Sequence, residues 1–254
     1  MYKNLGETPN EAILRFKNKN SGYIDVPMTY AGRLDPMAEG LLLVLSGNEL
    51  ANKDKYLGLQ KTYEFEILWG FETDTLDVLG KVSENSFSTY LSKDTDIFLL
   101  KNQDMFSTNF SKLTSKFEQS YPAYSSKPVL GKPLFQWARE GRISEIEIPK
   151  HEVELFSAEY ISRREVSKNK LLEEIKNKIS RVSGDFRQKE IIKSWEENLS
   201  NTNLDVFGID KFKVSVSSGF YVRQFVSDLA DNLGTRALTF HIKRTKIGQY
   251  ELGN

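Results

Sequence analysis

The chain contains no cysteine and only two histidines, His151 and His241, which lie far apart in the sequence. The absence of cysteine excludes disulfide bonds, thiol nucleophiles and thiolate metal sites, and it fits a reducing compartment. Two isolated histidines argue against a Ser-His-Asp triad and against a histidine-rich metal site. We therefore expect no metal ion in the protein.

Neither an excess of one charge nor a long apolar run is present. The 254 residues include 35 lysines and arginines and 35 aspartates and glutamates, so an anionic partner must bind to a local basic patch. The longest apolar run, Leu41 to Leu45, is far shorter than the ~20 residues that cross a bilayer, and the N-terminus lacks the apolar core of a signal peptide. The sequence thus predicts a cytoplasmic protein that does not associate with membranes.

The central feature of the sequence is a carboxylate, Asp35, between a Gly-Arg pair at 32–33 and Pro36. Proline fixes φ and biases the preceding residue toward extended geometry, so Asp35 cannot lie inside a helix that continues through Pro36. The apolar run at 41–45 that follows is typical of a buried strand or a short core helix. A charged group on a rigid turn beside an apolar wall is a common setting for a reactive carboxylate, although an Asp-Pro pair is also an ordinary turn.

Hydrophobic periodicity predicts a mixture of helices and strands. A helix begins at 8–11, because Thr8 can cap it and Pro9 suits its first position. In the last strand we expect Arg244 and Lys246 to be exposed. The order has no steady βαβ rhythm and no internal repeat, so the predicted fold class is α+β. The other predicted elements are helices over 134–139 and 220–233, strands over 62–70, 153–161, 211–217 and 240–250, and a helix-rich connection over 85–118.

The spacing of apolar residues over 168–199 differs from that in the rest of the chain. Apolar residues recur at helical spacing from Leu171 to Val182 and again from Ile191 to Leu199, with a Ser-Gly-Asp break at 183–185. This pattern predicts a hairpin of two amphipathic helices, inserted between two strands.

Several short motifs occur in a fixed order along the chain: Leu5-Gly6-x-Thr8, Gly32-x-Leu34-Asp35-Pro36-x-Ala38-x-Gly40, Lys61-Thr62-Tyr63, Gly70-x-x-Thr73-Asp74-Thr75-x-Asp77-x-x-Gly80, Tyr124-Ser125-Ser126-Lys127, Gly131-Lys132-x-Leu134-x-x-x-Ala138-Arg139-x-Gly141, and Ser218-Gly219-x-Tyr221-x-Arg223 before Asp228-Leu229. Together they resemble the TruB family, the bacterial synthases that make pseudouridine at position 55 of tRNA. Each motif is weak by itself, but their order and spacing together are specific. The resemblance covers about 1–161 and 212–250.

The resemblance implies a single pseudouridine synthase catalytic domain over 1–254. Such a domain has a curved, mixed and mostly antiparallel sheet, flanking helices and a central RNA-binding cleft. The helical hairpin would be an insertion at about 165–205. Only four residues follow Tyr250, so we expect the chain to lack the small C-terminal RNA-binding (PUA) domain that many family members carry. Either the catalytic domain binds RNA alone or the insertion supplies contacts, and a merely stabilising surface hairpin fits the sequence equally well.

The resemblance also implies the reaction. Family members isomerise uridine to pseudouridine with an aspartate as the catalytic group and with neither a metal nor a cofactor, and Asp35 stands at the position of that aspartate. The uridine must be flipped out of its stack to expose the glycosidic bond. The aspartate could add to the base, attack the sugar or act by acid–base steps, and the sequence does not distinguish these routes. The expected partner is RNA, above all the T-arm of tRNA, bound by a monomer through the shape of its loop.

Two further residues stand at active-site positions of the family. Tyr63 would stack on the flipped base and could act in proton transfer, although strand alternation alone favours a half-buried core aromatic. Arg223 would pair with Asp35 and keep it ionised, because an opposite charge lowers the pKa of a carboxylate. Without its motif, Arg223 could equally be a surface arginine at a helix edge. Asp74 and Asp77 could suggest a metal site, but no third carboxylate lies at ligand spacing, which favours structural hydrogen bonding.

Substrate binding is expected to depend on aromatic side chains and on local lysines and arginines, and therefore to weaken with salt. Among the residues expected to bind the substrate, Tyr221 would line the pocket and Lys61 would contact an RNA phosphate. The residues that we expect to bind the substrate are Tyr30, Arg33, Lys61, Lys127, Lys132, Arg139 and Tyr221.

Two residues just before Asp35 depart from the family's pattern. Tyr30 stands where the family commonly has a histidine, so an aromatic contact with the RNA loop would replace the histidine's contact. Arg33 makes this segment similar to the Gly-Arg-Leu-Asp of the pseudouridine synthases that act on ribosomal RNA, so a synthase of ribosomal or another RNA is one alternative. A second alternative is an RNA-binding or RNA-folding protein that has lost catalysis. The presence of Asp35 together with Tyr63 and Arg223 argues against it.

Overall fold

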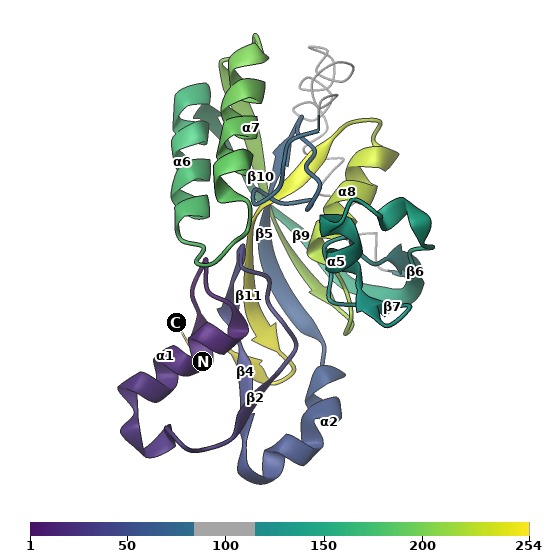
Figure 1. Ribbon diagram of the computed structural model, residues 1–254. Coiled ribbons are helices and arrows are strands. Elements are labelled where there is room, and N and C mark those ends of the chain that lie inside the picture. Colours follow the sequence, from purple (N-terminus) through teal and green to yellow (C-terminus); the bar gives the residue numbers. More distant parts are fainter. Residues whose placement is uncertain (84–114, 254) are drawn as a thin grey trace.

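The computed structural model describes residues 1–83 and 115–253, which are built around one mixed β-sheet (Figure 1). Within these ranges the sheet has eight strands, of which seven form a continuous path in the order β1 (Tyr2–Lys3), β3 (Ala38–Leu41), β11 (Ala237–Ile247), β5 (Lys61–Trp69), β10 (Val206–Val216), β9 (Lys150–Ser167) and β6 (Ser115–Ser120). The eighth strand, β12 (Tyr250–Glu251), pairs with β11. Strands β3 and β11 run parallel, and the other pairs run antiparallel. The predicted α+β class with a mostly antiparallel sheet is confirmed.

Helices cover both faces of the sheet. One face carries α8 (Val222–Asn232), and the other carries the pair α6 (Lys168–Ser180) and α7 (Gln188–Asn201), which connects β9 to β10 (Figure 1). The remaining described elements are α1 (Pro9–Lys19), α2 (Lys53–Leu57), α5 (Leu134–Arg139), the ladder of β2 (Met28–Ala31) with β4 (Leu43–Ser46), the ladder of β7 (Pro128–Val129) with β8 (Lys132–Pro133), and 3₁₀ helices at Ser21–Tyr23, Gly47–Asn52 and Ile143–Glu145.

The core is divided between the two faces of the sheet. Because side chains alternate along a strand, Phe65 and the other odd-numbered residues of β5 from 63 to 69 pack in the cluster that includes Phe225 of α8. Leu68 points to the opposite face, into a second cluster that includes Trp195 of α7. Trp195 is fully buried, and its indole N–H donates to Val78 O at 3.1 Å. The two helices of the hairpin therefore bury their apolar stripes against the sheet.

Most of the predicted elements are present. The helix that begins after Thr8 has a capping box, in which the Thr8 hydroxyl accepts the Glu11 N–H and the Glu11 carboxylate accepts the Thr8 N–H at 2.7 Å. The predicted helices over 134–139 and 220–233 are α5 and α8, the two helices of the predicted hairpin are α6 and α7, and the predicted strands are β5, β9, β10 and β11 with β12.

Two predictions need correction or a choice between alternatives. The helix-rich connection expected over 85–118 is wrong at its end, because Ser115–Ser120 form the edge strand β6, where Phe117 lies opposite Val153 of β9. Residues 85–114 of that connection lie outside the described residues. For the apolar run at 41–45 the strand alternative holds, since Leu41 ends β3 and residues 43–45 belong to β4. No described helix is long and apolar enough to span a membrane.

One row of residues across the sheet fixes the approach of β3 to β11. Gly40 of β3 lies opposite Arg244 of β11, which in turn lies opposite Tyr63 of β5. Gly40 has a φ of 110°, and a Cβ atom there would lie 2.3 Å from the carbonyl oxygen of Arg244. Only glycine fits this position, because a side chain would force the two strands apart.

We expect Gly40→Ala to destabilise the protein by about 3–5 kcal/mol, since it adds backbone strain and a steric clash between strands. Gly47→Ala is the matched control, because Gly47 also has a positive φ, of 57°, but an added Cβ meets no atom within 4 Å. The control should cost roughly 1–2 kcal/mol. Urea unfolding curves of the two variants measure the difference, and equal losses would contradict the proposed clash.

Candidate active site

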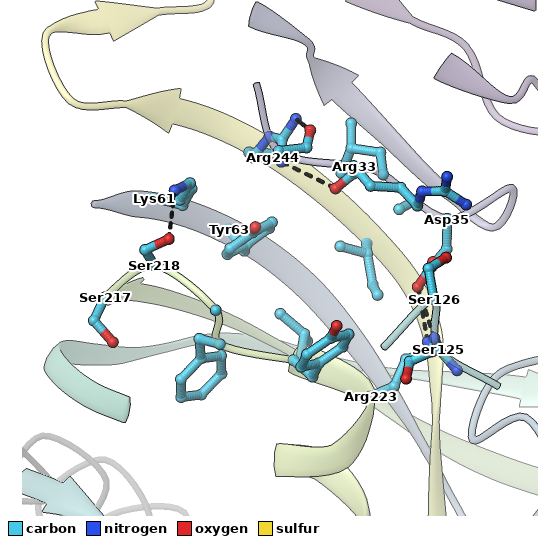
Figure 2. A pocket seen from close by; sticks show the side chains of 18 of the residues that line it. Arg33, Asp35, Lys61, Tyr63, Ser125, Ser126, Ser217, Ser218, Arg223 and Arg244 are labelled. Atoms are coloured by element: carbon cyan, nitrogen blue, oxygen red, sulfur yellow. Dashed lines mark hydrogen bonds and ion pairs between the residues drawn. The ribbon is translucent and has the colours of Figure 1, made fainter. Parts of the chain in front are cut away.

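A cavity of about 300 Å³ opens on the face of the sheet that carries α8 (Figure 2). Asp35 and Arg223 lie at one end, Lys61 and Ser218 lie at the other, and the ring of Tyr63 lies between the two ends. The structure therefore brings together the three residues predicted to be catalytic.

Asp35 lies on a tight turn between β2 and β3. Its carbonyl accepts the N–H of Ala38 at 3.0 Å, which closes the turn around Pro36, and its side chain is about one-third exposed (33%). The carbonyl of Pro36 accepts the N–H of Gly6 at 2.8 Å, so the N-terminal segment holds the turn from outside. The expectation that the carboxylate is presented from a turn agrees with this geometry.

Arg223, in the first turn of α8, is the partner of Asp35. Its Nε and Nη2 atoms both lie 2.9 Å from Asp35 Oδ2, and the residue is only 3% exposed. The remaining N–H groups donate to backbone carbonyls, Nη1 to Thr75 O and Nη2 to Tyr124 O at 3.2 Å. Three segments that are distant in sequence thus converge on one guanidinium. Arg223 is therefore not a surface arginine, the alternative that its position at a helix edge left open.

A second carboxylate, Asp77, lies behind Arg223. It is 5% exposed, and its Oδ2 lies 3.8 Å from Arg223 Nε. Its Oδ1 accepts the hydroxyl of Thr75 at 2.8 Å and the N–H of Leu79 at 2.9 Å. Burial raises the pKa of Asp77 to about 6, and the Asp35 charge acts in the same direction, while Arg223 opposes the shift. Asp77 therefore carries the structural hydrogen bonds expected of it.

Asp74 also accepts several hydrogen bonds. Its Oδ1 accepts the N–H of Lys81 at 2.9 Å, and its Oδ2 accepts the hydroxyl of Tyr124 at 3.1 Å and an N–H of Arg187 at 2.7 Å. Across the two described ranges, no group of three histidine, aspartate or glutamate side chains could hold a metal ion.

Two tyrosines form the apolar walls of the cavity. Tyr63 on β5 is 8% exposed, so it is a buried strand residue, and it also lines the cavity. Tyr221 precedes α8, and burial, together with the charge of Asp35, raises the pKa of Tyr221 to about 12. The backbone of Tyr221 is held by Gln119 through hydrogen bonds of 2.8 and 3.1 Å. No sequence pattern singled out Gln119, although it is fully buried.

Lys61 is not the surface lysine that a simple phosphate contact would require. It is 5% exposed, and its ammonium donates to Leu57 O and, at 3.3 Å, to the hydroxyl of Ser218. Burial lowers the pKa of Lys61 to about 8, and the nearby charge of Arg244 lowers it further. Only a group that enters the cavity could meet this ammonium.

The prediction that Arg244 is exposed is wrong. Its side chain is 1% exposed and donates to three carbonyl oxygens, those of Leu41 at 2.8 Å, Gly32 at 3.1 Å and Arg33 at 3.3 Å. Alternation along β11 shows which face the residue occupies, but not that the Asp35 turn covers that face. Figure 2 shows Arg244 reaching the backbone of Arg33, beside Asp35. Arg244 therefore holds the backbone beside Asp35, which the sequence reasoning missed.

Of the other predicted binding residues, three line a second cavity and two line neither cavity. Tyr30, Arg33 and Arg139 line a second cavity of about 370 Å³, which shares Asp35 with the first. The Arg33 guanidinium donates to the hydroxyl of Tyr30 at 3.2 Å. The remaining two, Lys127 and Lys132, line neither cavity: Lys127 Nζ lies 4.9 Å from the ring centroid of Tyr121, and Lys132 Nζ pairs with Glu140 at 2.6 Å.

The raised pKa of Asp77 predicts a pH dependence of stability. Between its ordinary value of 3.8 and about 6, the folded protein keeps a proton on Asp77 that the unfolded chain has lost. The free energy of unfolding should therefore fall as the pH rises from about 4 to about 7, by roughly 2–3 kcal/mol from this group. Asp77→Asn should remove that contribution. Urea unfolding of both proteins at several pH values measures it, and parallel stability curves would contradict it.

Comparison with known proteins agrees with this fold. The model of the TruB family pseudouridylate synthases, N-terminal domain, matches residues 26–184. The tRNA pseudouridine synthase B of Caldicellulosiruptor saccharolyticus is 27% identical over 223 residues, which are 88% of this chain and 58% of that protein. The enzyme of the same name from Aquifex aeolicus is 26% identical over 97% of this chain and 67% of its own length. The chain thus spans about three-fifths to two-thirds of these two relatives.

Solved structures give the same fold. The crystal structure of a Cbf5-Nop10-Gar1 complex matches 99% of this chain and 49% of its own chain, with a TM-score of 0.53 at 14% identity. The archaeal box H/ACA sRNP Nop10-Cbf5 complex matches with a TM-score of 0.51. At such low identity the likeness shows the fold alone. Since the family model covers more than half of the sequence, the chain belongs to the TruB family of pseudouridylate synthases.

Proposed function

We propose that this protein isomerises uridine to pseudouridine in RNA, with Asp35 as the catalytic group and uridine 55 in the T-arm of tRNA as the target. The observation that carries the proposal is the ion pair of Asp35 with the buried Arg223 at the end of a cavity lined by Tyr63, in a chain of the TruB family. Two relatives named tRNA pseudouridine synthase B support tRNA as the substrate class.

The cavity suits a single flipped nucleotide. Its volume of about 300 Å³ is at the small end of ligand pockets, and aromatic side chains such as Tyr63 give a flipped base a stacking surface. Asp35 at one end would then lie near the sugar, and Lys61 at the other end would face the far edge of the base. A base that remained stacked in RNA could not reach either residue.

The geometry leaves one carboxylate oxygen available for chemistry. Both contacts from Arg223 go to Asp35 Oδ2, whereas Oδ1 accepts no hydrogen bond from any described residue. The isomerisation breaks the N1–C1′ bond, forms a C5–C1′ bond, and moves a proton from C5 to N1, so it needs no second substrate. An anchored carboxylate with one free oxygen can serve as nucleophile or as base in that sequence.

Ribosomal or another RNA is the second candidate substrate, and Arg33 favours it. Arg33 is exposed, borders both cavities and pairs with no carboxylate in the described part of the chain. Its guanidinium is therefore available for a phosphate or a base edge. Mapping pseudouridine in RNA from cells with and without the protein distinguishes the two substrates. The monomeric state and the cytoplasmic location stay predictions.

Asp35→Asn should lower the rate of pseudouridine formation in a tRNA transcript by at least about a hundredfold, because the amide can act neither as nucleophile nor as base. Binding of the transcript should change little. The control is Asp54→Asn, which alters an exposed aspartate in α2. A normal rate for Asp35→Asn would refute the catalytic assignment. Transcript binding without product by the unaltered protein would support the non-catalytic alternative instead.

Arg33→Gln should weaken transcript binding and reduce the slope of log K against log salt by about 1, as expected for loss of one phosphate contact. Titrations at several salt concentrations measure both quantities. Arg236→Gln is the control, since Arg236 is already paired with Glu72 and Asp231. An unchanged salt slope for Arg33→Gln would show that Arg33 contacts no phosphate.

A further inference from the structure

The α6–α7 hairpin is tied to the segment at 73–82 by one face of α7. Arg187, which precedes α7, pairs with Asp74, and Glu190 in the first turn pairs with Lys81. One turn further, Ser194 Oγ accepts the N–H of Val82 at 3.1 Å, next to the Trp195 bond to Val78. Residues three and four apart lie on the same side of a helix, so these contacts form a continuous seam.

The segment at 73–82 also contacts Arg223 in the active site. Thr75 supplies the carbonyl that accepts from Arg223 Nη1, and Asp77 supplies the second carboxylate beside the same guanidinium. A shift of this segment would therefore move Arg223, and with it the carboxylate of Asp35.

Arg187 joins this segment to the second loop that holds Arg223. Its Nη1 lies 2.7 Å from Asp74 Oδ2, and its guanidinium carbon lies 5.0 Å from the ring centroid of Tyr124. The Tyr124 hydroxyl donates to the same Asp74 oxygen at 3.1 Å, and the Tyr124 carbonyl accepts from Arg223 Nη2. Arg187, at the tip of the hairpin, thus contacts both loops, those of Asp74 and Tyr124, whose carbonyls accept hydrogen bonds from Arg223.

The tip of the hairpin also contacts the other side of the Asp35 turn. The Ser183 hydroxyl donates to Glu11 of α1, and a Cβ atom at Gly6 would lie 2.3 Å from the carbonyl oxygen of Arg181, so the backbones are in close contact there. Gly6 in turn donates to Pro36 O, next to Asp35. The hairpin tip is therefore packed against segments on both sides of the ion pair.

We propose that Arg187 is a positioning residue of the active site, which holds Arg223 and Asp35 in reactive geometry by clamping the loops of Asp74 and Tyr124. This inference rests on the proposed synthase activity. The Arg187–Asp74 pair is partly exposed, at 24% and 33%, so its contribution to stability is small. Misplacement of a catalytic group by about 1 Å, in contrast, can cost roughly a hundredfold in rate. A positioning role therefore predicts a large loss of rate on substitution, whereas a purely stabilising role predicts only a small loss of stability.

The test is steady-state kinetics of Arg187→Met, Arg187→Lys and a control on a tRNA transcript. We expect Arg187→Met to lower kcat roughly tenfold to hundredfold, with KM within about twofold, because the Arg187 guanidinium, although it borders the second cavity, is already engaged by Asp74 and Tyr124. Arg187→Lys keeps the charge beside Asp74 and should recover part of kcat. The control, Arg164→Met, removes an ion pair of comparable length, 2.9 Å to Glu174 of α6; the two carboxylates that Arg164 pairs with, Glu174 and Glu66, both lie outside the 73–82 segment. It should leave kcat unchanged.

A double variant gives an independent readout. If Arg187 acts through Asp74, then Arg187→Met combined with Asp74→Asn should be no slower than the slower single variant, since both remove the same clamp. A kcat of Arg187→Met within twofold of the unaltered protein, or an equal loss in Arg164→Met, would overturn the proposal and leave the hairpin with a stabilising role only. An unaltered protein that forms no pseudouridine would instead refute the proposed function itself. Thermal unfolding of each variant separates misfolding from a loss of turnover.

Discussion

A guanidinium that is 3% exposed needs acceptors for its N–H groups, because a buried charge without partners is strongly destabilising. Arg223 finds them in Asp35 and in the carbonyls of Thr75 and Tyr124, from three segments distant in sequence. The arginine can be buried in this way only when all three segments are in place. The position of the Asp35 carboxylate therefore depends on loops that it does not touch, and those loops depend on the helices packed against them.

A second buried arginine holds the other side of the same turn. Arg244 donates to the carbonyls of Gly32, Arg33 and Leu41, and so fixes the backbone on both sides of Asp35. Its partners are neutral dipoles, so its charge is not cancelled, and it contributes to the lowered pKa of Lys61. The turn is thus held at its side chain by one arginine and at its backbone by another.

The sequence could predict whatever depends on local pattern. Alternation found β5 and the face that Tyr63 occupies, and the Thr8 cap located α1, because these signals act over a few residues. Pattern alone could not find the Asp35–Arg223 pair, whose members are 188 residues apart, and only the motif resemblance brought them together. The burial of Arg244 was missed because a strand's period does not reveal what covers each face. Carbonyl acceptors such as Thr75 O have no sequence signal at all, since every residue carries one.

In the proposed function, since the protein has no net charge, the RNA would contact local charges in the cavity. Its lining includes four cations, Arg33, Lys61, Arg223 and Arg244, and one carboxylate, Asp35. Arg223 and Arg244 already donate to protein acceptors, so they mainly shape the site. Arg33 is exposed, and Lys61, which also donates to Leu57 O and to the Ser218 hydroxyl, lines the cavity. Each phosphate that is neutralised adds about 0.7–0.9 to the salt slope. In the proposed function, binding through so few free cations should therefore be only moderately sensitive to salt, and selectivity would depend on the shape of the RNA loop and on the flipped base.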